Sequence, residues 1–122
     1  MIVNGTRGVI GDFNSVIFDF ERNGASCSNL QRDTLRFKNT IRECHLFDAN
    51  YVGTPFTWSR GSQQSRLDKL LINQAWRLRF QKATVYHLHP LKSDHCPLFL
   101  NFNEPFQPNR RRPFRFHYFK LH

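Results

Sequence analysis

The 122-residue chain lacks the features that mark membrane and secreted proteins. No apolar run approaches the roughly 18 residues needed to span a bilayer, and the first residues lack the apolar core of a signal peptide. The three cysteines, Cys27, Cys44 and Cys96, cannot all pair, and none has the Cys-x-x-Cys spacing of zinc and redox motifs. We therefore expect an intracellular protein without a membrane partner, whose thiols are reduced and mostly packed.

Acidic residues are also scarce. Asp and Glu number 9 against 18 Lys and Arg, which gives a formal charge of +9 and an isoelectric point near 10.2. This balance favours contact with polyanions such as nucleic acids, although charge alone indicates neither specificity nor catalysis. A hydrophobic content of 39%, with 15% aromatic residues, predicts one folded domain with a real core rather than a disordered tail.

The stretch from Val9 to Asn14 has an apolar start and then turns polar, which predicts a buried strand that ends at a pocket. Asp12 and Asn14 are two residues apart and therefore share one face of such a strand. A carboxylate beside a carboxamide suits the handling of a metal-bound phosphate and its attacking water. A Gly-Asp-Phe-Asn string is also typical of a simple turn, so this interpretation needs support from the rest of the chain.

Hydrophobic periodicity predicts a mixed order of helices and strands. Apolar residues recur at intervals of three and four from Leu30 to Cys44, which predicts an amphipathic helix covering one face of a sheet. Asn73 is expected to cap a short helix that continues through Phe80. The remaining predicted elements are a loop at 15–29, strands at 56–59, 66–72, 83–89 and 98–102, and a polar hairpin-like connection at 60–65.

Further polar residues stand out against this pattern. Asp68 interrupts an apolar strand, which is costly unless the carboxylate is paired or faces a site. Asp94 and His95 precede the last predicted strand, and a histidine transfers protons best when a carboxylate fixes its ring. His87 and His89 also share a face, but with no third ligand close by in the sequence we do not expect a zinc site there.

Together, the motifs Gly11-Asp12-Phe13-Asn14, Thr57-Trp58, Arg66-Leu67-Asp68 and Ser93-Asp94-His95-Cys96-Pro97 resemble the C-terminal half of the endonuclease/exonuclease/phosphatase superfamily. Within it, the segments 51–59 and 66–69 resemble the endonuclease domain of plant non-LTR (LINE-type) retrotransposons. The resemblance implies an α/β (α+β) fold, half of a four-layer sandwich with a mainly antiparallel or mixed sheet and flanking helices. It also implies Mg²⁺-dependent cleavage of DNA phosphodiesters.

The resemblance also implies catalytic roles for four residues. Asp12 would orient or deprotonate the attacking water, and Asn14 would hold the scissile phosphate. Asp68 would fix the imidazole of His95, which would stabilise the phosphate oxygen as charge develops. Which group acts as the base is left open by the sequence.

Three further residues would contact substrate or metal by the same resemblance. Trp58 would wall the pocket, and Arg66, together with Asn14, would bind substrate. Asp94, together with Asp12, would position Mg²⁺ or its water shell.

We divide the chain into a partial endonuclease domain at 1–103 and a basic, aromatic, linker-like tail at 104–122, similar to the start of the segment that joins such endonucleases to reverse transcriptase. In the superfamily the metal-binding Glu precedes the Gly-Asp-x-Asn motif, whereas eleven residues precede Asp12 here. We therefore expect a truncated domain that hydrolyses DNA weakly or not at all alone and depends on a partner, such as an N-terminal half or a reverse transcriptase segment.

Two other functions compete with this prediction. The chain could be a non-catalytic, basic nucleic-acid-binding module whose tail at 104–122 stacks on bases. It could also be a small-molecule phosphatase of the same superfamily, which the basic charge argues against. The DNA substrate that the resemblance implies makes the nucleus an expected compartment.

Overall fold

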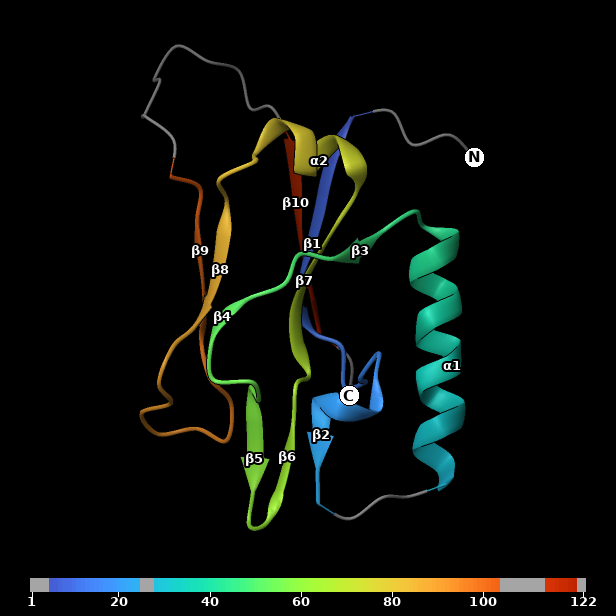
Figure 1. Cartoon of the computed structure of the whole chain (residues 1–122), viewed down its shortest axis with the longest axis vertical. Helices are drawn as coiled ribbons and strands as arrows, with labels where there is room; N and C mark the ends of the chain where they lie inside the picture. The colour runs from blue at the N-terminus through green and yellow to red at the C-terminus, as the bar shows by residue number, and fades with distance from the viewer. Residues whose placement is uncertain (1–4, 25–27, 104–113, 121–122) are drawn as a thin grey trace.

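The computed structural model describes residues 5–24, 28–103 and 114–120 and has an α+β fold (Figure 1). The described residues form three small sheets, two α-helices and one 3₁₀ helix. The strands are β1 (Thr6–Asp12), β2 (Arg22–Asn23), β3 (Phe47–Asp48), β4 (Val52–Gly53), β5 (Trp58–Arg60), β6 (Gln63–Ser65), β7 (Asp68–Ile72), β8 (Thr84–His87), β9 (Leu98–Asn101) and β10 (Phe114–Lys120); the helices are η1 (Asp19–Glu21), α1 (Ser28–Glu43) and α2 (Gln74–Arg79).

The central sheet has the strand order β10-β1-β7-β3, and the other two sheets have the orders β2-β6-β5 and β4-β8-β9. β1 pairs antiparallel with β7 and parallel with β10. In the β1–β7 register Ile10 lies opposite Leu70, and Asp12 lies opposite Asp68. Directly opposed residues point to the same face of a sheet, so the two carboxylates share one face of the central sheet.

That face of the central sheet packs against the sheet β4-β8-β9 and helix α2. Leu70 and Ile72 of β7 are buried in one cluster with Val85 of β8 and with Trp76 and Phe80 around α2. The alternation of side chains along β7 places Asp68 on the same face, at the end of this apolar row. The core therefore ends where the polar residues begin.

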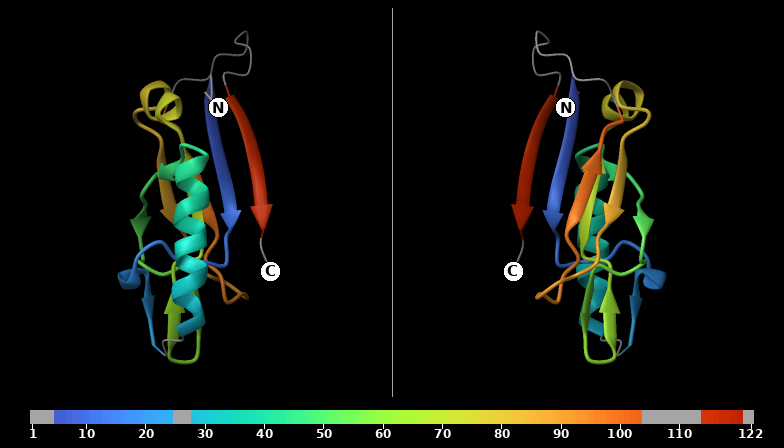
Figure 2. Two further views of the ribbon diagram at one scale, coloured as in Figure 1. Left: turned by 90° about the vertical axis from the view of Figure 1, so that its right-hand side faces the viewer. Right: turned by 90° about the vertical axis from the view of Figure 1, so that its left-hand side faces the viewer.

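The other face of the central sheet lies toward helix α1. Leu71 of β7 is buried with Phe13, Ile17 and Phe37, the last of which comes from α1. Figures 1 and 2 show α1 on the side of β1 and β7 that faces away from β8 and β9. The helix predicted from Leu30 to Cys44 is thus confirmed, with α1 covering one face of the sheet as expected.

Helix α2 begins as the sequence predicts. The side chain of Asn73 accepts a hydrogen bond of 3.0 Å from the backbone N–H of Trp76, which is the standard N-cap contact. Asn73 also binds β1, because its Oδ1 accepts from Arg7 N at 3.0 Å and its amide donates to Gly5 O at 2.8 Å. The cap therefore fixes α2 against the start of β1.

Gly8 makes the close packing of β1 and α2 possible. A Cβ atom at this position would lie 2.8 Å from Cζ3 of Trp76, which is closer than two carbon atoms can approach. The indole of Trp76, which is 1% exposed, therefore needs a glycine beneath it.

The predicted strands at 66–72, 83–89 and 98–102 are present as β7, β8 and β9, each shorter than predicted. The linker interpretation of 104–122 is wrong for 114–120, which form β10 at the edge of the central sheet. Residues 104–113 and 121–122 of that predicted tail lie outside the described residues. In the part of the chain that the structure describes, no helix is long and apolar enough to cross a membrane.

The described thiols are free. Cys96 is buried, as expected, whereas Cys44 at the end of α1 is exposed, so the expectation of packed thiols is wrong there. Burial raises the pKa of the Cys96 thiol, which keeps it protonated. The prediction for Cys27 lies outside the described residues.

Candidate active site

Asp12, Asp68 and His95 form a cluster at the ends of two paired strands. Asp12 ends β1, Asp68 begins β7, and His95 lies in the segment before β9. The Nδ1 atom of His95 donates a hydrogen bond of 2.8 Å to Oδ2 of Asp68. Its Nε2 atom lies 3.8 Å from Oδ2 of Asp12, which is longer than a hydrogen bond. The imidazole therefore stands between two carboxylates and is fixed by one of them.

The two carboxylates lie close together because of the strand register. Like charges that lie directly opposite each other in an antiparallel pair repel, which costs stability unless a cation lies between them. One potential ligand atom from each of Asp12, Asp68 and His95 lies within 4.8 Å of the other two. This arrangement is suited to a positively charged ligand, a metal ion included.

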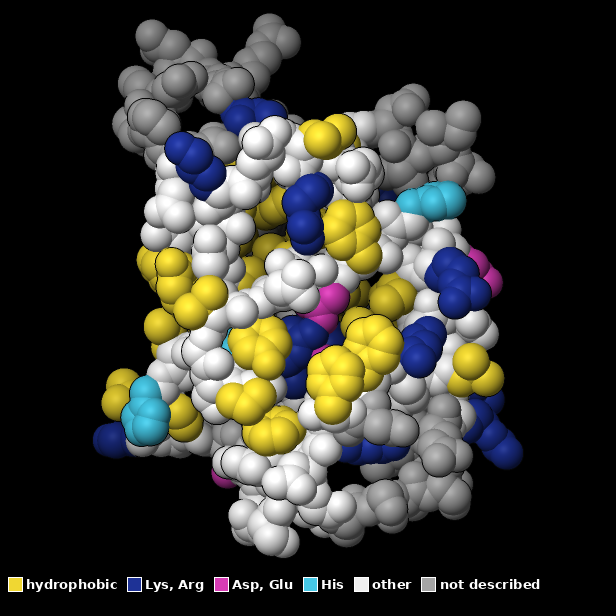
Figure 3. Space-filling model, viewed as in Figure 1, with side chains coloured by type: hydrophobic (Ala, Val, Ile, Leu, Met, Phe, Trp, Pro, Cys, Tyr) yellow, Lys and Arg dark blue, Asp and Glu magenta, His cyan; other side chains and the backbone are white. Residues whose placement is uncertain are grey.

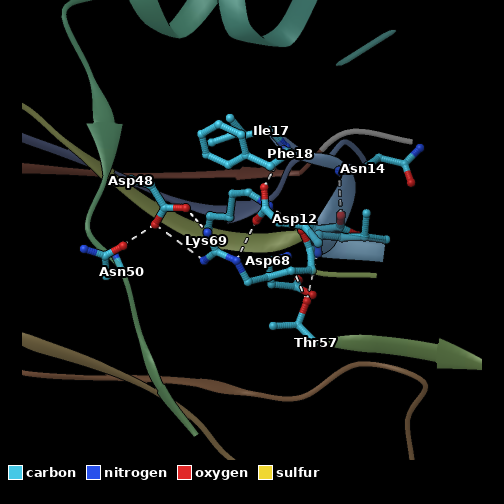
Figure 4. A network of polar contacts seen from close by, with 12 residues as sticks. Asp12, Asn14, Ile17, Phe18, Asp48, Asn50, Thr57, Asp68 and Lys69 are labelled. Carbon is cyan, nitrogen blue, oxygen red and sulfur yellow. Dashed lines mark hydrogen bonds and ion pairs between the residues drawn. The ribbon is translucent and has the colours of Figure 1, made fainter. Parts of the chain in front are cut away.

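Thr57 positions the start of β7 beside this cluster. Its side chain is completely buried, and its Oγ1 accepts hydrogen bonds of 3.0 Å from the backbone N–H groups of both Leu67 and Asp68 (Figure 4). The backbone of Thr57 also accepts from Cys96 N at 2.7 Å. Through its hydroxyl and its carbonyl, Thr57 therefore connects the segment that carries Asp68 to the segment that carries His95.

Asn14 follows Asp12 in a turn. The backbone N–H of Asn14 donates to Oδ1 of Asp12 at 2.9 Å, and Asn14 has a positive φ of 52°. Asparagine tolerates this left-handed conformation better than most residues do. The side chain of Asn14 is exposed and so is accessible to a ligand. Its backbone amide holds the Asp12 carboxylate, a contact that the sequence did not predict.

Trp58 and Asp94 frame His95 through their backbones. Trp58 of β5 forms an isolated β-bridge with His95, and Ser59 N donates to the carbonyl of Asp94 at 3.0 Å. The Asp94 side chain is exposed, and its carboxylate is not one of the ligand atoms that converge at the cluster. The geometry therefore does not support the prediction that Asp94 holds a metal together with Asp12.

Arg66 is placed differently from the prediction that it binds substrate. Its side chain is buried, and its Nε donates to Oε2 of Glu21 at 2.7 Å. A second guanidinium nitrogen binds the carboxylate of Asp48, and the guanidinium lies 4.7 Å from the ring centroid of Tyr51. The charge of Arg66 is thus engaged inside the protein, which corrects the predicted substrate contact.

Glu21 is the centre of this buried charge network, and the sequence analysis did not identify it. Its Oε1 accepts from Ile17 N at 2.8 Å and Phe18 N at 2.9 Å, and its Oε2 lies 3.1 Å from the ammonium of Lys69. Desolvation raises the pKa of Glu21, but the charges of Lys69 and Arg66 and the backbone donors outweigh it, so the net pKa is lowered. A glutamate inside a predicted loop gave no signal for such a role.

His87 is separate from the cluster. Its ring stacks on Tyr51 at a centroid distance of 4.2 Å, and its Nδ1 donates to the carbonyl of Thr54 at 2.6 Å. Burial lowers the pKa of His87, although the Thr54 carbonyl opposes this effect. His89 is exposed. The two histidines of the predicted strand thus lie in different environments.

A cavity of about 530 Å³ lies between α1 and the central sheet. Its lining is mainly apolar and includes Val9 and Leu71. Along their strands these residues alternate with Ile10 and Leu70, which point to the same face as Asp12 and Asp68. The cavity therefore opens on the face of the sheet that does not carry Asp12 and Asp68.

No protein-family model, curated protein or solved structure matches this chain.

Proposed function

We propose that this chain is a divalent-metal-dependent phosphodiesterase domain of the retroelement endonuclease type, built as half of a four-layer α/β sandwich, and that it cleaves DNA weakly when it acts alone. The observation that carries the proposal is the convergence of Asp12, Asp68 and His95 at the ends of paired strands. The resemblance of the surrounding motifs and the formal charge of +9 support it.

The donor set is compatible with Mg²⁺. This ion binds proteins through one or two carboxylates, keeps several waters and takes its other ligands from substrate phosphates. Asp12 would hold it as the first carboxylate. Asp68 would be the second through its other carboxylate oxygen, because its Oδ2 accepts a hydrogen bond from His95. When bound, the ion would polarise the phosphoryl oxygen and offset the repulsion between the two carboxylates.

The residues themselves would divide the chemistry. Asp12 accepts a proton from water as the water attacks phosphorus, and the exposed Asn14 amide donates to a phosphate oxygen. His95 is oriented by its 2.8 Å bond to Asp68 and directs Nε2 toward the reacting phosphate. As the new P–O bond forms, the ester bond to the leaving oxygen breaks, that oxygen takes up a proton from solvent, and the strand is nicked.

A plasmid-nicking assay with Mg²⁺ tests the proposal. At a stoichiometric amount of protein we expect slow nicking that both Asp12→Ala and His95→Ala abolish. Asp33→Ala and His89→Ala are matched controls, because these are exposed residues outside the cluster, and they should nick like the wild type. Folded wild-type protein that nicks no faster than Asp12→Ala would contradict the proposal.

Metal binding gives a second readout that does not depend on turnover. Mg²⁺ should raise the melting temperature of the wild type but not that of Asp12→Asn, whose side chain can still accept the 2.9 Å bond from Asn14 N. An equal shift in both proteins would place the ion elsewhere. Inositol phosphate that competes with DNA for the site would favour the small-molecule phosphatase alternative.

A further inference from the structure

Two phenylalanines on either side of Asp19 present their rings to solvent. Phe18 is 49% exposed and Phe20 is 76% exposed. Their rings are nearly parallel, with an interplanar angle of 9° and a centroid distance of 5.2 Å. Aromatic side chains normally dominate the buried core, so a stacked pair held at the surface requires an explanation.

The segment that carries these rings is held firmly from below. The carboxylate of Glu21 accepts hydrogen bonds from the backbone N–H groups of Ile17 and Phe18. The backbone N–H of Glu21 donates to Phe18 O at 3.0 Å. The same carboxylate is fixed by Arg66 and Lys69 in the interior. Because its support is already ordered, the aromatic pair would lose little conformational entropy when it binds a ligand.

Positive charge lies beside the pair. The ammonium of Lys38 lies 5.1 Å from the ring centroid of Phe18. Lys38 belongs to α1, whose exposed residues include Arg32, Arg36 and Arg42. On the face of the molecule seen in Figure 3, hydrophobic side chains gather in the lower half, and Lys and Arg side chains lie beside them over α1.

We propose that Phe18 and Phe20 form a stacking platform for an unpaired nucleobase of single-stranded nucleic acid, with Lys38 binding a neighbouring phosphate. Flat exposed rings beside cations are the combination that binds single strands, because every base offers a π-face and every nucleotide a charge. DNA and RNA share this chemistry.

The platform goes beyond the proposed cleavage, since stacking requires neither a metal ion nor His95. Phe18 belongs to the segment after β1 that also carries Asn14.

Fluorescence anisotropy of a labelled oligothymidylate tests the platform, measured in EDTA so that cleavage plays no part. We expect Phe20→Ala to raise the Kd by about 5- to 150-fold, the range that base stacking on one aromatic side chain supports. Phe20→Trp should restore binding. Leu91→Ala is the matched control, because Leu91 is an apolar side chain that is 92% exposed in another loop.

An oligonucleotide of abasic sites provides the decisive comparison, because it keeps the phosphates and removes the bases. On this strand Phe20→Ala and the wild type should bind equally, whereas Lys38→Met should weaken binding to both strands. An oligouridylate arm shows whether DNA or RNA is preferred. Equal binding of oligothymidylate by wild type and Phe20→Ala, or equal loss in Leu91→Ala, would overturn the proposal whatever the nicking assay shows.

Discussion

Lys69 provides a quantitative test of the buried charge network. Its side chain is 1% exposed, and its ammonium lies 3.1 Å from Oε2 of Glu21 and binds the carbonyl of Arg66. Burial lowers the pKa of Lys69 from 10.5 to about 8, although the charge of Glu21 opposes this effect. A lysine whose pKa is lowered in the folded state is more readily protonated in the unfolded chain, so its burial costs stability at neutral pH.

The sign and size of the effect follow from proton linkage. Between about pH 8 and 10.5 the unfolded chain binds more protons at Lys69 than the folded protein does, so the free energy of unfolding rises with pH. At about 1.4 kcal/mol for each pH unit, the rise across this window amounts to about 3 kcal/mol. Lys69→Met removes the group and should remove the rise.

At neutral pH we expect Lys69→Met to cost less than the roughly 3–5 kcal/mol that removing one partner of a buried ion pair usually costs, because Glu21 keeps other partners. Glu21 keeps its 2.7 Å contact with Arg66 and its two backbone donors. Urea unfolding followed by tryptophan fluorescence from pH 7 to 10.5, in about half-unit steps, measures both proteins. Lys82→Met, at an exposed lysine, is the control. A wild-type minus Lys69→Met difference that stays flat above pH 8 would refute the reasoning.

Three further predictions concern stability. Glu21→Gln should cost about 3 kcal/mol in urea unfolding, because it leaves buried cations without their shared anion. Gly8→Ala should cost about 1–3 kcal/mol and lower the melting temperature, since its Cβ would meet the Trp76 ring. Because the pKa of His87 is lowered in the folded state, the free energy of unfolding should fall as the pH drops below about 6.5. In urea unfolding, His87→Phe should therefore lose less stability between neutral and acid pH than the wild type does, whereas a His89→Phe control should lose as much as the wild type.

The sequence predicted the elements with a strong local pattern. Helix α1 has a three- and four-residue apolar period over 16 residues, and Asn73 is a preferred N-cap residue directly before α2. The contact between Asp68 and His95 that the resemblance implies is present at 2.8 Å, while its catalytic role stays a proposal. Local periodicity thus predicted α1 and the start of α2, while the resemblance of the short motifs singled out Asp12, Asp68 and His95.

What the sequence missed depends on long-range pairing. Glu21 and Arg66 are 45 residues apart, and nothing local marks them as partners. β3 and β4 are two residues long, too short to show an alternating pattern, and β10 pairs with a strand at the other end of the chain. The prediction for Arg66 failed for the same reason, because its charge was judged without its buried partners.

The strand register explains why the charge network and the candidate site occur together. Along β7, Lys69 and Leu71 face α1 while Leu70 faces β8, so a slip by one residue would exchange these faces and move Asp68 into the apolar layer beneath α1. The packing that prevents this slip also fixes Asp12 opposite Asp68 despite their repulsion. The central sheet therefore sets the positions of Asp12 and Asp68, while the segment before β9 places His95. Substitutions in the core of β7 should alter the proposed cation binding even where Asp12, Asp68 and His95 are all retained.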